Sequence, residues 1–341
     1  MRSGSKKVLE IAQEQVCFET PLALSSGAFI DQPTVAYKTW GQLNQARDNA
    51  ILVCHALSGS ADIDAWWPGI IGSNGAFDPA QHFVIGSNVL GGCYGSSGPR
   101  LGNAASDRFP RISIADMVAL QHRLIDHLGV RSLKLVVGAS MGGMQALEWA
   151  YRHPERVRAI APLCCPARQS AQALALNWLQ VKAIEADPKN GLKLARQMGL
   201  LTYRSFDDFE TRFSREQRAD GHYQVLSYLE HHGDKFVDRF DPISYLRLTQ
   251  AMIDWDIGHG RGGTEAALRQ IKQPAFVLSI LSDQLYLPRE QEFLAAHLPR
   301  GRLHQIDSRY GHDGFLVEMD QVSSRLRQFL NHLDASNRRA A

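Results

Sequence analysis

The amino-acid sequence predicts an α/β protein, in which helices cover both faces of a mostly parallel sheet and a helical insertion interrupts the core. Three observations support this prediction. Short apolar runs rich in β-branched residues alternate with helical patterns, as expected for parallel strands joined by helices. Residues 166–268 contain helix-forming segments and no convincing strand. A glycine-flanked serine, Ser140, stands where one predicted strand gives way to a helix.

Six segments are predicted to be strands, of which the first five are apolar runs of strand length. They are residues 51–54, 83–86, 133–137, 157–161, 275–280 and 302–306. Residues 116–128 are predicted to form a helix, since apolar side chains recur there at spacings of three and four: Met117, Leu120, Leu124 and Leu128. This alternation favours one sheet with helices on both faces.

The predicted organisation is a core of residues 18–165 and 269–334, a helical lid of residues 166–268, and tails at residues 1–17 and 335–341. Within the lid, helices are expected at residues 171–185, 192–201 and 223–231. Ligands bind at the carboxyl edge of the strands in open α/β sheets, so the lid is expected to pack over that edge.

Composition and charge exclude several classes of protein. The 37 basic and 35 acidic residues leave a net charge of +2, which gives no basic footprint for nucleic acid. No apolar stretch of about 18 residues could span a bilayer and no signal peptide is recognisable, so we expect no membrane association and a cytoplasmic location. The five cysteines are odd in number and form no CxxC pair, which argues against a disulfide framework and a structural zinc site. No metal is expected.

The strongest local signal is Gly138-Ala-Ser-Met-Gly142, which follows the predicted strand at 133–137 and precedes a helix. This is the G-x-S-x-G nucleophile elbow of the α/β-hydrolase fold, in the strand–turn–helix context that the motif requires. Small flanking residues let the strand and helix approach closely. The helix N-terminus then directs free N–H groups at a developing oxyanion. Ser140 is therefore the predicted nucleophile.

A nucleophilic serine needs a base, and the base needs an orienting carboxylate. In this fold the chain order is serine, acid, histidine. Asp283 follows the predicted strand at 275–280, and His312 follows the last predicted strand. His55 is the best rival base, but it precedes the elbow and is expected to shape the loop after its own strand. Ser140, Asp283 and His312 are the predicted catalytic triad.

The backbone N–H groups of Leu57 and Met141 are the predicted oxyanion donors. Leu57 lies in the loop after the strand at 51–54, and Met141 directly follows the nucleophile, which are the two donor positions of this fold.

Two glycine-rich segments are not expected to bind nucleotide phosphate. Residues 258–263 lack a preceding strand, and residues 91–98 lack the G-K-[ST] of a P-loop, although the latter are expected to border the site.

These motifs carry a family likeness. The chain resembles the homoserine O-acetyltransferases of methionine biosynthesis, a branch of the α/β-hydrolase fold, from about residue 18 to 332. The matching stretches are residues 36–44, 49–59, 66–72, 83–93, 138–149 and 310–318, with 191–196 and 201–204 in the lid. The elbow alone is generic, whereas its Met-Gly-Gly-Met continuation, the Trp66-Trp67 pair and the Gly-Gly-Cys93 segment are specific. Compared with the family, the chain is shorter after Pro99 and after Pro188.

The resemblance implies an activity and a substrate site. It implies transfer of an acetyl group from acetyl-CoA, as a co-substrate, to the hydroxyl of L-homoserine through an acyl-serine, with no tightly held cofactor. By the same resemblance, Arg196 holds the amino acid's carboxylate, Tyr203 lines the pocket and Asp313 receives the ammonium. One cationic and one anionic anchor suit a zwitterionic acceptor. A homodimer formed through the lid is also implied.

Several alternatives stay open at this point. Serine as acceptor is compatible with the same machinery, because it is one methylene shorter and a single methylene in a pocket is worth only about 1–3 kcal/mol. Succinyl-CoA as donor is compatible as well, because one cationic residue could accommodate its additional carboxylate. A triad by itself does not distinguish an alcohol from water, so an esterase or thioesterase is a further alternative. Arg196 and Asp313 argue against it. A catalytically silent binding protein on this fold is disfavoured by the intact triad.

Overall fold

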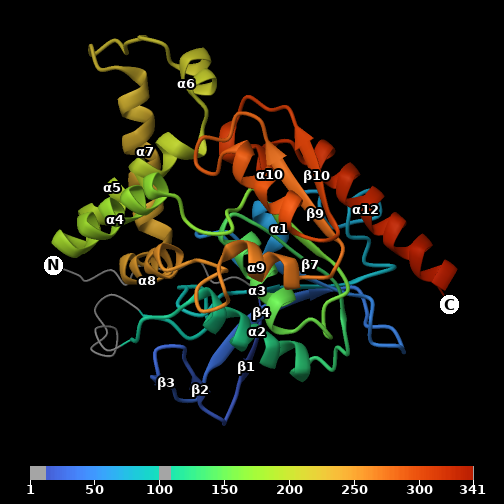
Figure 1. Ribbon diagram of the computed structural model, residues 1–341. Helices are drawn as coiled ribbons and strands as arrows, with labels where there is room; N and C mark the ends of the chain where they lie inside the picture. The colour runs from blue at the N-terminus through green and yellow to red at the C-terminus, as the bar shows by residue number, and fades with distance from the viewer. Residues whose placement is uncertain (1–12, 100–108, 341) are drawn as a thin grey trace.

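The computed structural model describes residues 13–99 and 109–340, with side chains described as far as Ala335. An eight-stranded sheet forms its centre, in the spatial order β1-β4-β6-β5-β7-β8-β9-β10 (Figure 1). The strands are β1 Glu14–Cys17, β4 Thr34–Trp40, β5 Ala50–Cys54, β6 Phe83–Ser87, β7 Leu133–Ala139, β8 Ile160–Leu163, β9 Ala275–Ile280 and β10 Gly301–Ile306. The pairs β1–β4 and β4–β6 are antiparallel, and all later neighbours are parallel. The predicted mostly parallel sheet is therefore confirmed.

Helices cover both faces of this sheet. The short hairpin β2 Leu22–Ala23 with β3 Phe29–Ile30 lies outside it. Outside the lid the helices are α1 Ile63–Trp66, α2 Ile114–His127, α3 Met141–Arg152, α9 Thr264–Gln270, α10 Pro288–His297, α11 Gly314–Val317 and α12 Met319–Ala340, with a 3-10 turn at Gly311–Asp313. Strand β5 illustrates the layering. Leu52 joins the apolar cluster under α2, α3 and α10, whereas Ile51 and Val53 join the cluster under α1 and α12.

Five consecutive helices lie between β8 and β9, followed by α9, and we call these five the lid. They are α4 Ala171–Ala186, α5 Pro188–Tyr203, α6 Phe206–Arg212, α7 Gln224–Arg239 and α8 Pro242–Ile253. In Figure 1, α4 to α7 extend away from the sheet on the side opposite to α12. Two Asp-Pro pairs set helix starts. Asp187 and Asp241 each accept two backbone N–H bonds as N-caps, and the following proline occupies the first helical turn.

The predicted elements are mostly found, with differences at particular places. The strand predicted at 157–161 is displaced to β8 Ile160–Leu163, because its register is set by pairing with β7 and β9, while Val157 makes only an isolated bridge to Leu133. Strands β1 and β4 and helices α6 and α8 were not predicted. The predicted tails are wrong in part, since β1 lies within 1–17 and α12 continues through 335–340. Residues 1–12 and 341 lie outside the described residues.

The glycine-rich segment 258–263 has a structural explanation. Its Arg261 donates two hydrogen bonds to the carboxylate of Glu148, at 2.9 and 2.6 Å, and stacks over the Tyr151 ring at 4.0 Å. Glu148 is 1% exposed, so its carboxylate on α3 is shielded from water. The guanidinium of Arg261 supplies this buried charge with an ion-pair partner. A Cβ on Gly258 would lie 2.2 Å from the Thr264 backbone nitrogen. The segment therefore fastens the start of α9 to α3. None of the described helices is long and apolar enough to cross a membrane.

Candidate active site

The nucleophile elbow joins β7 to α3. Ser140 has φ 57° and ψ −122°, a left-handed backbone conformation that is rare for a residue with a side chain. A Cβ on Gly142 would lie 2.0 Å from the Cys54 carbonyl oxygen, and one on Gly138 would lie 2.6 Å from the same atom. Only glycine therefore allows α3 to pack this closely against β5 and β7. The tight turn holds Ser140 at the carboxyl edge of the sheet.

Asp283 and His312 form a buried pair at the same edge. The Nδ1–H of His312 donates to Asp283 Oδ2 at 2.7 Å, and both residues are at most 3% exposed. The other carboxylate oxygen, Oδ1, accepts the backbone N–H groups of Leu285 and Tyr286 at 2.9 and 3.0 Å. Three donors therefore fix the carboxylate, and the carboxylate fixes the tautomer of the imidazole.

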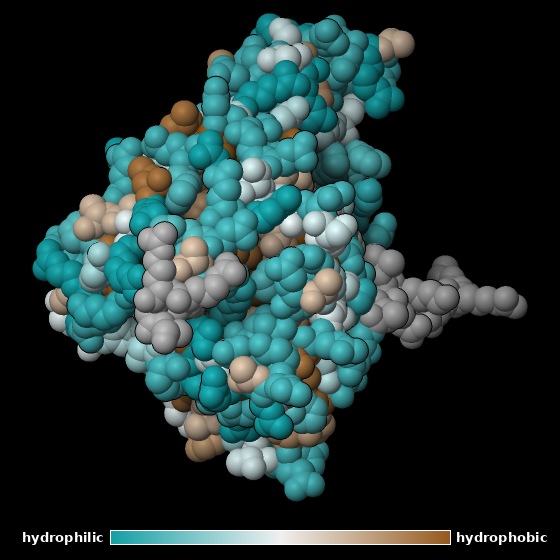
Figure 2. Space-filling model, turned by 90° about the vertical axis from the view of Figure 1, so that its right-hand side faces the viewer, coloured by the Kyte–Doolittle hydropathy of each residue, from teal (hydrophilic) through white to brown (hydrophobic). Residues whose placement is uncertain are grey.

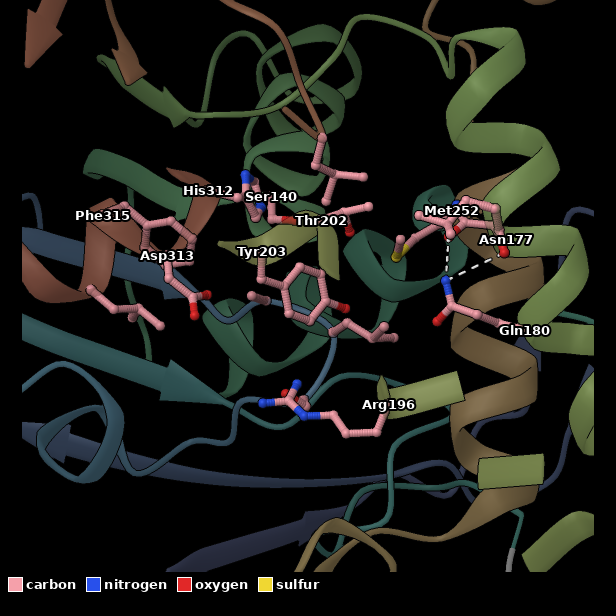
Figure 3. Close-up of a pocket in the computed structure, with 16 residues that line it drawn as sticks. Ser140, Asn177, Gln180, Arg196, Thr202, Tyr203, Met252, His312, Asp313 and Phe315 are labelled. Atoms are coloured by element: carbon pink, nitrogen blue, oxygen red, sulfur yellow. Dashed lines mark hydrogen bonds between the residues drawn. The ribbon is translucent and has the colours of Figure 1, made fainter. Parts of the chain in front are cut away.

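The remaining nitrogen of His312 faces the site. Nε2 is buried and has no hydrogen-bond partner among the described residues. Burial by itself lowers the pKa of His312, but the charge of Asp283 and its hydrogen bond outweigh burial, so the pKa lies above its ordinary value of 6.5. His312 and Ser140 line one cavity of about 130 Å³ beneath the lid, and lie next to each other in Figure 3. A ring nitrogen with no other partner is thus placed beside the serine.

Leu57 and Met141, the predicted oxyanion donors, lie in the loop after β5 and at the start of α3. Leu57 is in the loop of residues 55–59, which follows β5 and which we call the oxyanion loop; it lines the same cavity as Ser140. Met141 is the first residue of α3, where a backbone N–H has no partner within the helix. No backbone hydrogen bond from the Leu57 N–H is found within residues 13–99 and 109–340.

His55, the rival base, has both ring nitrogens engaged. Nδ1 lies 2.7 Å from the Ala56 carbonyl oxygen, and the Val89 backbone N–H donates to Nε2 at 3.2 Å. Because Nε2 accepts, the network assigns the proton to Nδ1, which donates. Burial lowers the pKa of His55 to about 4, so the ring is neutral. His55 therefore shapes its loop, as expected from the sequence.

The three residues predicted to bind substrate also meet in this cavity. Arg196 and Tyr203 come from α5, and Asp313 adjoins His312. Figure 3 shows Tyr203 between Asp313 and Arg196. The Arg196 guanidinium lies 5.5 Å from the Tyr203 ring and 5.0 Å from the Phe236 ring, and it makes no ion pair within the described residues. Burial raises the pKa of Tyr203, so its hydroxyl stays protonated.

Comparison with known proteins identifies the family. The family model of the alpha/beta hydrolase fold matches residues 49–318. A homoserine O-acetyltransferase of Chlorobium luteolum is 44% identical over 351 aligned residues, which cover 97% of this chain and 98% of that protein. The chain belongs to the homoserine O-acetyltransferase family. The predicted fold, family and acyltransferase class are therefore confirmed.

Solved structures place this homoserine O-acetyltransferase family member among both transferases and hydrolases. The homoserine O-acetyltransferase of Bacillus anthracis has a TM-score of 0.86 at 23% identity, covering 94% of this chain and 97% of that one, a similarity of fold. An acetylester hydrolase from Corynebacterium glutamicum has a TM-score of 0.82 at 26% identity, covering 94% and 96%. The fold thus supports acyl chemistry with either an alcohol or water as acceptor.

Three polar residues in or beside this family member's site escaped prediction: Asn177, Gln180 and Arg204. Asn177 and Gln180 of α4 line the cavity at 4% and 2% exposed, and Gln180 accepts a 2.6 Å hydrogen bond from the Tyr245 hydroxyl. Arg204 lies with its Nε 3.0 Å from Asp313 Oδ2, an ion pair by distance without the alignment of a hydrogen bond. Two amides spaced three apart in the otherwise apolar segment 173–181 were a sequence signal for Asn177 and Gln180.

The two shorter stretches noted in the sequence differ in what can be described. After Pro188 there is no loop, because the chain continues directly as helix α5 from Pro188 to Tyr203. Asp187 alone separates α4 from α5, as the C-cap of one and the N-cap of the other. The shortening after Pro99 falls on residues 100–108, outside the described residues. Within the described residues, no group of three His, Cys, Asp or Glu side chains is placed to hold a metal ion.

Proposed function

We propose that the chain transfers an acetyl group from acetyl-CoA to the hydroxyl of L-homoserine through a covalent acyl-Ser140 intermediate. One observation carries the proposal: a single cavity is lined by Ser140 and His312 and also by the oppositely charged Arg196 and Asp313. The first pair suits acyl transfer through a serine, and the second suits an acceptor that is an amino acid. Family membership supports both parts.

In the first step Ser140 Oγ attacks the thioester carbonyl and its proton passes to Nε2 of His312. The negative charge on the former carbonyl oxygen is stabilised by the backbone N–H groups of Leu57 and Met141. The tetrahedral intermediate collapses, the carbon–sulfur bond breaks, and the thiol of CoA leaves with the proton from His312. The imidazolium formed in between is stabilised by Asp283, 2.7 Å from Nδ1.

In the second step the acceptor hydroxyl gives its proton to His312 Nε2 and attacks the acyl-serine carbonyl. The bond to Ser140 Oγ then breaks, and the serine oxygen takes the proton back from His312. Arg196 holds the carboxylate of the acceptor, and Asp313 holds the ammonium. Arg204 pairs with Asp313 Oδ2, which leaves Oδ1 for the substrate. Burial raises the pKa of Asp313 and Arg204 opposes that shift, so Arg204 favours the carboxylate form that an ammonium group requires.

A matrix of donors and acceptors tests the proposal. Acetyl-, propionyl- and succinyl-CoA are combined with L-homoserine, L-serine, L-threonine and water, and release of free CoA is measured. We expect acetyl-CoA with L-homoserine to have the highest kcat/KM. Full turnover with water alone would make the protein a thioesterase, like the hydrolases that share its fold. A preference for L-serine or for succinyl-CoA would replace the acceptor or the donor and leave the triad in place.

Arg196→Ala is expected to weaken use of the acceptor specifically. The loss in kcat/KM for L-homoserine should be about 2–4 kcal/mol, the scale for removing a charged partner from a buried ion pair. Formation of the acyl-enzyme from acetyl-CoA, measured in single-turnover experiments without acceptor, should change much less. Lys189→Ala is the matched control, since Lys189 is an exposed cation at the start of the same helix. Equal damage to both half-reactions would place Arg196 in the donor site or in the fold.

We also propose a homodimer formed through the lid. Its outer helices expose large apolar side chains: Leu174, Trp178 and Leu179 of α4, and Leu194 and Leu201 of α5, all between 36% and 54% exposed. The face drawn in Figure 2 is mostly hydrophilic with separate hydrophobic patches. Light scattering after gel filtration should give twice the chain mass, and Trp178→Glu should give the monomer. A monomeric unsubstituted protein would exclude the dimer.

A further inference from the structure

The oxyanion loop is held by hydrogen bonds at two of its carbonyl groups, those of Ala56 and Ser58. The first is the carbonyl of Ala56, which accepts the Nδ1–H of His55 at 2.7 Å and the backbone N–H of Gly59 at 2.9 Å. The Ala56 carbonyl and the Leu57 N–H belong to one trans peptide, so they point in opposite directions. Fixing this carbonyl therefore fixes the direction of the N–H group that is the proposed oxyanion donor.

The second carbonyl is tied to the lid. Nη1 of Arg239, near the end of α7, donates to the Ser58 carbonyl oxygen at 3.1 Å. Residues 58 and 239 are far apart in sequence, and this bond joins the core loop beside the nucleophile to a lid helix. The peptide that carries the Leu57 N–H lies two peptide units before this carbonyl in the same short loop, so a shift of Ser58 would move that donor as well.

Arg239 is itself held in one orientation. The same Nη1 donates to the Tyr94 hydroxyl at 2.8 Å, and that hydroxyl donates back to the Arg239 carbonyl at 3.1 Å. The guanidinium also lies 4.8 Å from the Phe236 ring, and the Tyr94 ring meets Phe240 edge to face. Tyr94 is 7% exposed and belongs to the glycine-rich segment 91–98, which was expected to border the site.

We infer that Arg239 is a positioning residue for the oxyanion hole: it sets the oxyanion loop through the Ser58 carbonyl and so makes the geometry of the Leu57 N–H depend on a docked lid. The inference rests on the proposed function insofar as that function assigns the oxyanion to Leu57. His55 fixes the loop from the core, and Arg239 fixes it from the lid. Neither side chain needs to touch the substrate.

This role predicts a kinetic pattern that differs from that of a substrate-binding arginine. Acylation and deacylation both pass through a tetrahedral oxyanion at the same carbonyl carbon, so a displaced Leu57 N–H slows both. Complete removal of one oxyanion donor costs about 10²–10³ in kcat, and misplacing a donor should cost less, about 10–100-fold. The KM for the acyl donor should change by less than about threefold, because the donor is not what Arg239 binds.

The experiment compares Arg239→Gln, Arg239→Lys and the control Lys235→Gln, an exposed cation one turn earlier on α7. Hydrolysis of p-nitrophenyl acetate is measured alongside acetyl transfer, because that ester requires neither CoA nor an amino-acid acceptor. Failure of the proposed donor or acceptor would therefore leave this readout intact. Burst kinetics separate acylation from deacylation, and thermal unfolding checks that each variant is folded.

In Arg239→Gln the rate constants of acylation and deacylation are both expected to fall by about 10–100-fold. Arg239→Lys should recover part of this loss, because the lysine ammonium can still reach one of the two acceptors. Lys235→Gln should leave both rate constants unchanged. Unchanged rate constants for both steps in folded Arg239→Gln would overturn the inference. So would a loss confined to the KM of the amino-acid acceptor, since Arg239 would then belong to the acceptor pocket. Equal losses in Arg239→Gln and Lys235→Gln would show a general effect of charge on the lid.

Discussion

Ser140→Ala is expected to lower acetyl transfer by at least about 10⁴-fold, because the account gives this hydroxyl the only covalent step. The substitution removes one oxygen atom from a side chain that makes no capping hydrogen bond, so the elbow should still fold. Transfer of acetyl from acetyl-CoA to L-homoserine, followed by free CoA, measures the loss. Thermal unfolding of the variant should follow that of the unsubstituted protein closely.

Ser279→Ala is the matched control for this variant. Ser279 is a fully buried serine on β9, its hydroxyl has no partner within the described residues, and it does not line the cavity. Removing its oxygen should leave activity within about threefold, since it changes neither charge nor the reacting groups. Activity of Ser140→Ala within tenfold of the unsubstituted protein would rule out the acyl-serine.

Asp283→Asn is expected to cost about as much, on the order of 10⁴-fold in kcat. An asparagine amide can donate to Nδ1, which would move the ring proton to Nε2 and deprive Ser140 of its proton acceptor. The carboxamide has nearly the same shape, so the two backbone N–H groups of Leu285 and Tyr286 can keep one oxygen acceptor. Asp307→Asn is the control, because Asp307 is an exposed carboxylate on the same connection that leads to His312.

The same variant should change the pH dependence. His312 acts as a base only when neutral, so kcat/KM for the acyl donor falls as pH decreases through the pKa of His312, which lies above 6.5. Asp283 is what raises that pKa against the effect of burial. Without its charge, the acidic limb of the residual activity should move to lower pH. A limb that stays in place or moves upward in Asp283→Asn would contradict the assignment of His312 as the base.

The order of strands and helices in the core and the positions of the reacting residues could be predicted, because short patterns in the sequence determine them. The elbow needs glycines at 138 and 142, because a Cβ atom at either position would collide with the Cys54 carbonyl oxygen. That requirement is visible in the sequence as the G-x-S-x-G motif. Asp283 and His312 could be placed because each follows a strand in the order that the fold imposes. The structure brings all three to one edge of the sheet.

What could not be predicted depends on contacts between distant segments. Strand β4 carries a lysine and two threonines and lies toward the antiparallel edge, so it lacks the apolar run that reveals a central strand. Strand β8 contains Pro162, and only its pairing with β7 and β9 sets its bounds. Arg204 falls in a stretch that resembles the family, but its role depends on the ion pair with Asp313, more than one hundred residues away, which no local pattern reveals.

The most direct test of the account is the mass of the protein after it is mixed with acetyl-CoA in the absence of any acceptor. Rapid quenching followed by intact-mass and peptide analysis should find the added mass of one acetyl group, on the peptide that contains Ser140. The adduct should disappear when L-homoserine is added and should be absent in Ser140→Ala. An acetyl group on another residue, or one that persists in Ser140→Ala, would contradict transfer through an acyl-Ser140 intermediate.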